Sequence, residues 1–265
     1  MTDNGMGADT APMHRDRSRA SSFGANAELY DRSRPSYPAA LVDDLVARGP
    51  TSVLDVGCGT GLLGRAFVRR GLRVTGVEPD ERMAEVAARH GIDVEVSGFE
   101  QWPAAARRFD LLVSGQAWHW VEPVAGAQKA AEVLAPGATI ALAWNIAEMQ
   151  SDLRARLDVV YAELAHGAAT PVVANLPHVW MHPGTAEEAL AQNGAFCDLE
   201  HTAYPWERQY TRDEWLAQLE THSDHHLMDP DDRAGLLGAV GAAIDGLGGS
   251  FTMRYQCRVT MGRRG

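Results

Sequence analysis

An acid and a row of glycines have the residue types and the spacing to hold a charged, nucleotide-like ligand. Asp55 lies in the short apolar run 53–56, and Gly57, Gly59 and Gly61 follow it at alternate positions. Glycine has no Cβ, so a turn built from glycines lets the backbone approach a ligand closely. An acid beside that turn suits a ligand end with a positive charge, such as an α-amino group or a sulfonium.

A second acid, Glu78, follows the next apolar run at 73–77. An acid at the end of such a run can accept hydrogen bonds from both hydroxyls of a ribose. Gly59, Gly61 and Gly64 also satisfy the G-x-G-x-x-G pattern of dinucleotide turns, but those turns place an anionic pyrophosphate at a helix N-terminus. The acid before the turn therefore favours S-adenosylmethionine over NAD, and an NAD-dependent dehydrogenase stays as the less favoured alternative.

Histidines in two later segments could accept protons. His119 has an imidazole whose ordinary pKa lies near neutrality, so it is either a general base or a hydrogen-bonded residue that shapes its loop. In the cluster His222, His225 and His226, we expect His222 to face the substrate and at least two of the three to lie at the surface. The cluster lacks the spacing of a metal site, so no metal is predicted. The predicted catalytic residues are His119 and His222.

The elements that must position these residues alternate along the first half of the chain. Apolar runs predict strands, and segments with an apolar face predict helices between them. The predicted strands are 52–56, 73–77, 92–96, 109–114 and 138–144, and the predicted helices are 62–70, 81–90 and 124–134. This alternation predicts an α/β fold with a parallel sheet and right-handed crossovers. The glycine turn then lies at the carboxyl edge of the sheet, where ligands bind.

The N-terminus and the second half of the chain differ from this pattern. Residues 1–22 are rich in Gly, Asp, Arg and Ser, which predicts a disordered tail. The two prolines in residues 23–38 predict an extended segment, which either lies over the mouth of the site or simply packs at the N-terminus. Capping boxes open two of the later helices. A helix is expected at 39–48, before the first strand. The later helices are expected at 152–166, 185–193, 211–220 and 230–247, and the later strands at 196–210 and 251–261.

The composition limits the possible partners. Asp plus Glu number 35 and Lys plus Arg number 24, so the formal net charge is −11. This charge repels phosphate backbones and anionic membranes, so neither nucleic acid nor membrane is expected as a partner. The three cysteines lack metal-ligand spacing and suit a reducing compartment. With no signal-peptide-like start and no apolar run near the ~20 residues that cross a membrane, we expect a cytoplasmic protein.

Several segments together resemble the motifs of one family, the class I S-adenosylmethionine-dependent methyltransferases. Tyr30 to Pro38 and Gln116 to Trp120 resemble the small-molecule members related to the ubiquinone/menaquinone-biosynthesis and trans-aconitate types. The general motifs are VLDVGCGTG at 53–61, GVEPD at 76–80, FDLLV at 109–113 and LAPGA at 134–138.

This resemblance implies a Rossmann-like seven-stranded sheet with its last strand antiparallel. It also implies a helical cap from inserts after strands five and six, and S-adenosylmethionine as the cofactor. The expected organisation is a single domain over 23–265. Its parts are a cofactor-binding core at 23–145, cap helices at 146–195 and 211–249, and strands six and seven at 196–210 and 250–262.

The resemblance also assigns residues to the cofactor. The family often has an Asp after strand three that meets the adenine, whereas this chain has Ser97-Gly98-Phe99-Glu100 there. The adenine is therefore expected to meet Phe99, Glu100 and Met83. The remaining expected contacts are Asp55, Gly57, Cys58, Gly59 and Gly61 for the methionine part, Glu78 and Pro79 for the ribose, Tyr30 and Arg34 as residues that close over the cofactor, and Ser114 and Gln116 facing the sulfonium.

The predicted function is methyl transfer to an O, N or C nucleophile of a small molecule. Tryptophans in the predicted site loops and cap favour an aromatic or heteroaromatic acceptor. Asn145, at the end of strand five, is expected to orient a polar group of that acceptor. A catalytically silent domain that binds S-adenosylmethionine is the alternative of a different class. The expected oligomeric state is a monomer or a homodimer.

Overall fold

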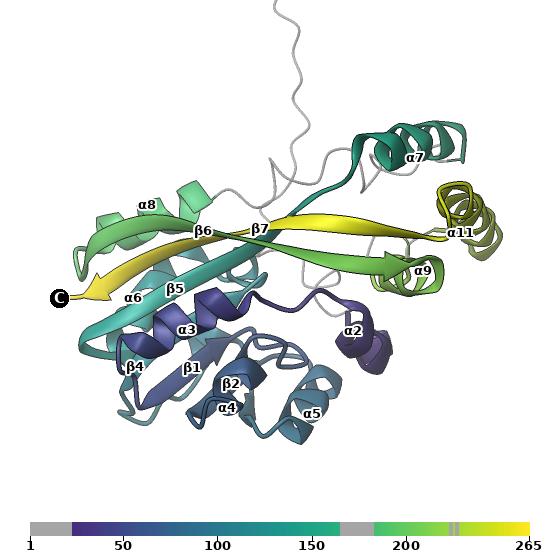
Figure 1. Ribbon diagram of the computed structural model, residues 1–265. Coiled ribbons are helices and arrows are strands. Elements are labelled where there is room, and N and C mark those ends of the chain that lie inside the picture. The colour runs from purple at the N-terminus through teal and green to yellow at the C-terminus, as the bar shows by residue number, and fades with distance from the viewer. Residues whose placement is uncertain (1–22, 165–182, 223–224, 226–227) are drawn as a thin grey trace, which may run out of the picture.

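A seven-stranded sheet with the strand order β3-β2-β1-β4-β5-β7-β6 forms the centre of the protein. The computed structural model describes residues 23–164, 183–222, 225 and 228–265, so the predicted tail at 1–22 lies outside the described residues (Figure 1). Strands β1 to β5 run parallel to one another, and β7 is antiparallel to both β5 and β6. The predicted α/β fold with an antiparallel last strand is confirmed. The strands are β1 (Ser52–Val56), β2 (Arg73–Glu78), β3 (Asp93–Val96), β4 (Phe109–Gly115), β5 (Leu134–Glu148), β6 (Phe196–Thr211) and β7 (Ser250–Arg264).

Helices cover both faces of this sheet and bury its apolar side chains. On one face, α3 (Ala39–Ala47), α4 (Gly64–Val68) and α5 (Glu81–Arg89) contribute to a core that includes Leu45, Phe67 and Ala87. On the other face, α6 (Pro123–Val133) and α8 (Pro183–Asn193) enclose a second core. The short 3-10 helix η3 (Phe99–Gln101) lies on that same side. Because both faces are covered, the inner parallel strands β1 and β4 are nearly continuous runs of buried residues, whereas the edge strand β3 has none.

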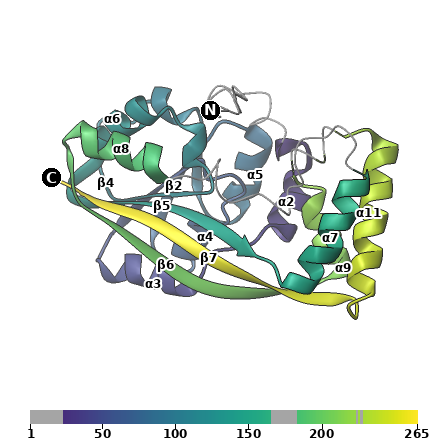
Figure 2. The same cartoon turned by 90° about the horizontal axis from the view of Figure 1, so that it is seen from above.

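A separate helical cap lies beyond the carboxyl ends of the parallel strands. It consists of α7 (Ser151–Leu164), α9 (Arg212–Leu219) and α11 (Pro230–Asp245), which pack together around their own aromatic and aliphatic core. Figures 1 and 2 both show these helices at one end of the long ribbon formed by β6 and β7. The paired residues of this ribbon run from Phe196 and Arg264 to Thr211 and Ser250, so the same two strands serve the core and the cap.

The structure corrects the predicted extent of the cap. Helix α8, within the range 146–195 assigned to cap helices, packs against α6 and β6. Leu190 is fully buried in the core on that face of the sheet. The apolar residues of α8 therefore complete the covering of the sheet, and of the helices described in this range only α7 belongs to the cap.

The N-terminal segment is a helix where an extended chain was predicted. The 3-10 helix η2 (Phe23–Asn26) leads into α2 (Ala27–Ser33), and the Asn26 side chain accepts a hydrogen bond from the Leu29 amide at the start of α2. Ala27 and Leu29 are buried, which stabilises the helix by packing. Only residues 34–38, beside the two prolines, lie outside regular structure.

Two element boundaries also differ from the sequence prediction. Helix α4 begins at Gly64 and not at residue 62, because the preceding residues belong to the glycine turn. Strand β5 begins at Leu134 and not at residue 138, and its pairing with β4 has a register shift around Pro136 and Gly137. It continues to Glu148 because β7 pairs with it over that length.

Candidate functional site

The glycine turn between β1 and α4 has a backbone that side chains would obstruct. Gly57, Gly59 and Gly61 have φ angles of +63°, +55° and +84°, in the left-handed region that favours glycine. A Cβ on Gly57 would lie 2.6 Å from the Cβ of Ala117, and one on Gly61 would lie 2.6 Å from Cδ1 of Ile92. A Cβ on Gly59 would meet only the methyl end of Met83, at 3.5 Å. The turn thus leaves space at Gly59, where its backbone can face a ligand.

Asp55 is a buried carboxyl group without a hydrogen-bond partner among the described residues. It is 1 % exposed, and neither carboxylate oxygen makes a hydrogen bond. The Gly64 amide faces it from the start of α4 but does not reach hydrogen-bond geometry. Burial is the main cause that raises the pKa of Asp55 to about 8, with the Gly64 amide acting against it and the charge of Glu78 acting with it. Orphaned buried oxygens of this kind are rare in folded proteins and mark a place where a ligand group completes the structure.

Glu78, the acid of the second motif at the end of β2, is hydrogen-bonded to the glycine turn. Its Oε2 accepts a hydrogen bond from the Gly59 amide at 2.9 Å, and its Oε1 accepts one from the Asp80 amide at 3.0 Å. Burial raises the pKa of Glu78 to about 7, although both amides lower it. Each oxygen keeps a second lone pair, so the predicted contact with ribose hydroxyls is compatible with these bonds.

Gln116, after β4, holds a strained position at the same edge of the sheet. Its φ is +54°, which is uncommon for a residue other than glycine. The backbone amide donates to the Ala143 carbonyl at 2.9 Å, and the side-chain Nε2 donates to the Asn145 carbonyl at 3.3 Å. The side-chain Oε1 is buried without a partner. Strain of this kind clusters at functional sites, which agrees with the predicted position of Gln116 near the reacting group.

The other predicted cofactor residues differ in how far their groups are already engaged. The Ser114 hydroxyl donates to the Val56 carbonyl at 2.9 Å, and Met83 packs beside Tyr30 of α2.

Phe99 packs on Trp118 in the core, with ring centroids 5.8 Å apart. The Glu100 carboxylate accepts a hydrogen bond from the Glu122 amide at 2.9 Å. Pro79 is exposed, and the Cys58 thiol is buried against Gly76, with its pKa raised by burial. Their contacts with adenine and ribose stay predictions.

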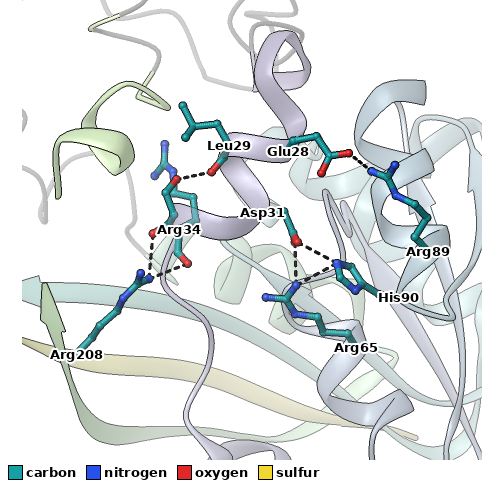
Figure 3. Close-up of polar contacts among 9 residues, drawn as sticks. Glu28, Leu29, Asp31, Arg34, Arg65, Arg89, His90 and Arg208 are labelled. Carbon is teal, nitrogen blue, oxygen red and sulfur yellow. Dashed lines mark hydrogen bonds and ion pairs between the residues drawn. The ribbon is translucent and has the colours of Figure 1, made fainter. Parts of the chain in front are cut away.

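Helix α2 is attached to the core beside this site by ion pairs (Figure 3). Asp31 meets Arg65 of α4 at 2.9 Å, and it meets Nε2 of His90 at 3.0 Å. These groups are largely buried, with side-chain exposures of 16 % for Asp31 and 15 % for Arg65. Glu28 pairs with Arg89 at the surface.

The end of α2 is attached to the cap by a different set of contacts. The Arg34 guanidinium donates from Nε to Oγ1 of Thr221 at 2.7 Å and from a terminal nitrogen to the Thr221 carbonyl at 2.9 Å. Arg208 of β6 donates to the carbonyls of Ser33 and Arg34 at 2.9 Å and 3.1 Å (Figure 3). Arg34 also lies over the Tyr30 ring, 5.0 Å from its centroid. The predicted pair Tyr30 and Arg34 therefore lies where the core, α2 and the cap meet.

The two predicted catalytic histidines are buried in different places. His119 has an Nδ1 without a partner, and burial lowers its pKa to about 4, so its imidazole is neutral at physiological pH. Burial also holds the pKa of His222 well below its ordinary value, with the charges of Arg34 and His225 acting in the same direction. The structure brings His222 to Arg34 at the cap, whereas His119 lies in the loop after β4.

The expectation of at least two surface histidines in the 222–226 cluster is wrong for His225. This side chain is 1 % exposed, and its Nε2 lies 3.2 Å from the Tyr161 hydroxyl of α7. His222 is half-buried, with an enclosed Nε2 that has no partner among the described residues. His226 lies outside the described residues.

Asn145 does not offer a free group to a substrate. Its Nδ2 donates to the Ser36 carbonyl at 2.9 Å, and its Oδ1 accepts from the Trp206 indole at 3.0 Å. Together with the Gln116 bond to its carbonyl, these contacts join the N-terminal segment, β6 and the loop after β4. Asn145 thus positions other parts of the site, a role that its place at the end of β5 could not reveal alone.

Sequence reasoning missed several residues of this site because their partners are far away in the chain. Tyr37 is one: a Cβ on Gly115 would lie 2.3 Å from its hydroxyl, so Gly115 makes room for it. Burial raises the pKa of Tyr37 well above its ordinary value, and Asp55 is among the neighbouring charges. Gly115, the last residue of β4, was the sequence signal that could have indicated a close neighbour there. No sequence signal identified Arg208 or Thr221 as partners of the N-terminal segment.

The comparison of sequences finds similarity to methyltransferases over part of this chain. A family model described as a methyltransferase domain matches residues 53–137. An uncharacterised methyltransferase of Mycobacterium tuberculosis is 38% identical over 131 residues, which cover 49% of this chain and 54% of that protein. The trans-aconitate 2-methyltransferase of Mycolicibacterium gilvum is 35% identical over 92 residues, covering 34% of this chain and 35% of that protein. The chain therefore spans about half the length, or less, of the curated relatives it matches.

The comparison of folds agrees with the sequence matches. A candidate type II methyltransferase from Anaeromyxobacter dehalogenans superimposes with a TM-score of 0.65 at 23% identity, covering 87% of this chain and 97% of that one. Because the match covers 87% of this chain, it extends beyond residues 53–137. The resemblance drawn from the motifs and the predicted fold are both confirmed.

Proposed function

We propose that the chain transfers a methyl group from S-adenosylmethionine to a small molecule, because residues 53–137 match the model of a methyltransferase domain. The observation that carries the proposal is the Asp55 carboxyl group, which is buried and without a partner beside the glycine turn. A ligand end that carries positive charge and N–H groups supplies what this carboxyl group lacks. S-adenosylmethionine is the cofactor of the family and has such an end.

The described residues fit this cofactor in three places. Asp55 and the turn at Gly57, Gly59 and Gly61 would hold the methionine part, and the space at Gly59 admits it. Glu78 would hold the ribose with its remaining lone pairs. The cofactor supplies an electrophilic methyl group on a sulfonium.

The residues around the reacting group would orient the acceptor and exclude water. Bringing two bound reactants into line can lower a barrier by ~7–11 kcal/mol, so positioning could supply most of the acceleration. Gln116 offers a fixed, unpartnered carbonyl oxygen toward this region. His119 is neutral and can accept a proton from an O–H or N–H acceptor as its methyl bond forms. The segment from α2 to Tyr37 would cover the cofactor and keep water from the sulfonium.

The acceptor is proposed to be a small molecule with an O, N or C nucleophile and an aromatic or heteroaromatic body. The aromatic side chains of the cap core support an acceptor with a flat apolar surface. The relative from Mycolicibacterium gilvum is a trans-aconitate 2-methyltransferase, which supports a small-molecule acceptor.

Nucleic acid is not expected, because the net charge of −11 opposes it. A cytoplasmic location and a monomeric or homodimeric state stay predictions. In the described part of the chain, none of the helices combines the length and apolarity of a membrane span.

Calorimetry with S-adenosylhomocysteine tests the cofactor assignment. We expect the wild-type protein to bind S-adenosylhomocysteine and not NAD, and we expect Asp55→Asn to weaken binding at least 100-fold. Asp80→Asn is the matched control, because Asp80 adjoins Glu78 but pairs with Arg82 at the surface. Binding of NAD alone would establish the dehydrogenase alternative instead.

Turnover separates an enzyme from a silent binding domain. Incubation with labelled S-adenosylmethionine and fractionated small-molecule extracts should give labelled product together with S-adenosylhomocysteine. Cofactor binding without turnover over every fraction would favour the non-catalytic alternative.

A further inference from the structure

Helix α9 and the turn that follows it present three buried polar atoms that the described structure leaves without partners. They are the indole nitrogen of Trp215, Oε1 of Gln218 and Nε2 of His222. Trp215 and Gln218 are each 5 % exposed. Their spacing of three residues places these two side chains on one side of α9, and His222 lies in the turn after the helix, where its amide donates to the Leu219 carbonyl. Buried polar groups normally find partners, so three in one short segment indicate a missing ligand.

Trp215 and Gln218 lie in one cluster between α9 and the β6–β7 ribbon. The hydroxyls of Tyr210 and Tyr255 lie 2.7 Å apart, and the Trp215 ring packs on the Tyr210 ring with centroids 5.2 Å apart. The Gln218 side chain faces the Tyr255 hydroxyl and acts against the rise of the Tyr255 pKa, while its Oε1 has no partner. Aromatic walls with a few inward polar atoms are typical of small-molecule sites.

Two positive charges border this cluster without a carboxylate partner. The Arg208 guanidinium lies 4.4 Å from the centroid of the Tyr210 ring, and Arg34 reaches Thr221 and His222 from the other side. Within the described ranges, neither guanidinium comes within 4.0 Å of an acidic oxygen. The Glu214 carboxylate, which feels the charge of Arg208, is engaged chiefly by the Thr211 amide of the capping box. Partly buried cations of this kind favour an anion and oppose a cationic amine.

We infer that this cluster is the acceptor-recognition site and that the acceptor is an organic acid. Its carboxylate is received at Arg34 and Arg208, and its polar substituents are received by Trp215, Gln218 and His222. That the bound acid is the methyl acceptor rests on the proposed function. The position of the site and its preference for an acid follow from the orphaned atoms and from the two guanidinium groups without a carboxylate partner. The cofactor also carries a carboxylate, so the experiment must separate the two sources.

The stability of the ligand-free protein gives the first test. If the orphaned atoms wait for a ligand, Gln218→Met and His222→Leu remove buried unsatisfied atoms and should each raise Tm by about 2–4 °C. Thr221→Val is the matched control on the same segment. It should lower Tm, because Thr221 is bonded to Arg34 and to the Gln218 carbonyl. A fall in Tm for both Gln218→Met and His222→Leu would show that these groups serve the folded structure, and the inference would be overturned.

Ligand class is tested by calorimetry on protein saturated with S-adenosylhomocysteine, which occupies any cofactor carboxylate site. The probes are 4-hydroxybenzoate, 4-hydroxybenzyl alcohol and 4-hydroxybenzylamine, which differ only in the group on one ring carbon. We expect the acid to bind at least tenfold more tightly than the alcohol and the amine not to bind. Equal binding of acid and alcohol, preference for the amine, or binding of none would overturn the assignment.

A variant of Arg208 connects the binding to the proposed residues. Arg208→Gln keeps a donor for the α2 carbonyls but removes the charge, so affinity for 4-hydroxybenzoate should fall about tenfold while affinity for S-adenosylhomocysteine stays within twofold. An equal loss for both ligands would place the carboxylate of the cofactor at Arg208 and overturn the inference. If S-adenosylhomocysteine fails to bind the wild-type protein, the proposed function fails separately. The Tm test of the orphaned atoms then still stands on its own.

Discussion

The cofactor half and the cap bury their unsatisfied polar groups in different ways. In the cofactor half, the main-chain turn decides the geometry: three glycines with positive φ surround Asp55, and Glu78 is bonded to two amides. In the cap, the orphaned atoms of Trp215 and His222 are side-chain atoms within an aromatic cluster. A backbone-built site fixes one ligand closely, whereas a site built from side chains can change its ligand by single substitutions. One common cofactor and varied acceptors fit this division.

The strongest test of the backbone-built half is Asp55→Asn. In the wild-type protein the pKa of the Asp55 carboxyl group, about 8, lies far above the 3.8 of the unfolded chain. The contribution of this group to stability is therefore fully present below pH 3.8 and is lost as pH rises through about 8. At about 1.4 kcal/mol per pKa unit, the variant should be several kcal/mol more stable than wild type above pH 8, while it loses cofactor binding. Thermal unfolding between pH 5 and 9 measures this. A difference independent of pH would contradict the buried, protonated state.

Gly61→Ala tests whether the turn is as constrained as its geometry indicates. The added Cβ meets a left-handed φ and Cδ1 of Ile92 at 2.6 Å, so we expect a loss of about 2–5 kcal/mol in the free energy of unfolding. Gly137→Ala is the control, because Gly137 has a φ of +82° and nothing within 4 Å of its Cβ position. It should lose only about 1–2 kcal/mol. Urea unfolding compares them, and equal losses would mean that packing around the turn is loose.

Asp31→Asn tests the attachment of α2 to the core. The substitution removes the charge that two partly buried partners, Arg65 and His90, share, so we expect a loss of about 1–2 kcal/mol and weaker S-adenosylhomocysteine binding. Glu28→Gln breaks only the exposed pair with Arg89 and should change stability by less than about 0.5 kcal/mol. Unfolding and calorimetry at low and high salt measure both. An Asp31 variant with wild-type affinity would separate α2 from the cofactor.

Thr211→Ala is the smallest test and concerns the cap. Thr211 and Glu214 form a complete capping box at the start of α9, and its loss typically costs about 1 kcal/mol. Because α9 carries the inferred acceptor site, the affinity for 4-hydroxybenzoate should fall while that for S-adenosylhomocysteine holds. Calorimetry with each ligand separates the two regions. Parallel losses would show that the regions are coupled more tightly than their contacts suggest.

The sequence was informative where a local pattern decides the structure. Residues 52–56 were predicted as a strand with its observed boundaries, and the capping box at 211–214 opens α9 as expected. The helix α2 was missed because burial of Ala27 and Leu29, which stabilises it, comes from distant segments. The exposure predicted for His225 failed for the same reason, since Tyr161 of α7 covers it. The residues within motifs could be named from the sequence, whereas the contacts of Arg208 and Asn145 join segments far apart in the chain and could not be predicted from it.

The unbroken ribbon of β6 and β7 has a consequence for how ligands enter and leave. Since the paired strands run from the core into the cap, a hinge between the two would have to bend a continuous ladder of backbone hydrogen bonds. Helix α2 is held by side-chain contacts alone on both sides, through Asp31 and Arg34. We therefore expect ligands to enter and leave by displacement of α2, and the rate at which that helix detaches would limit the release of S-adenosylhomocysteine.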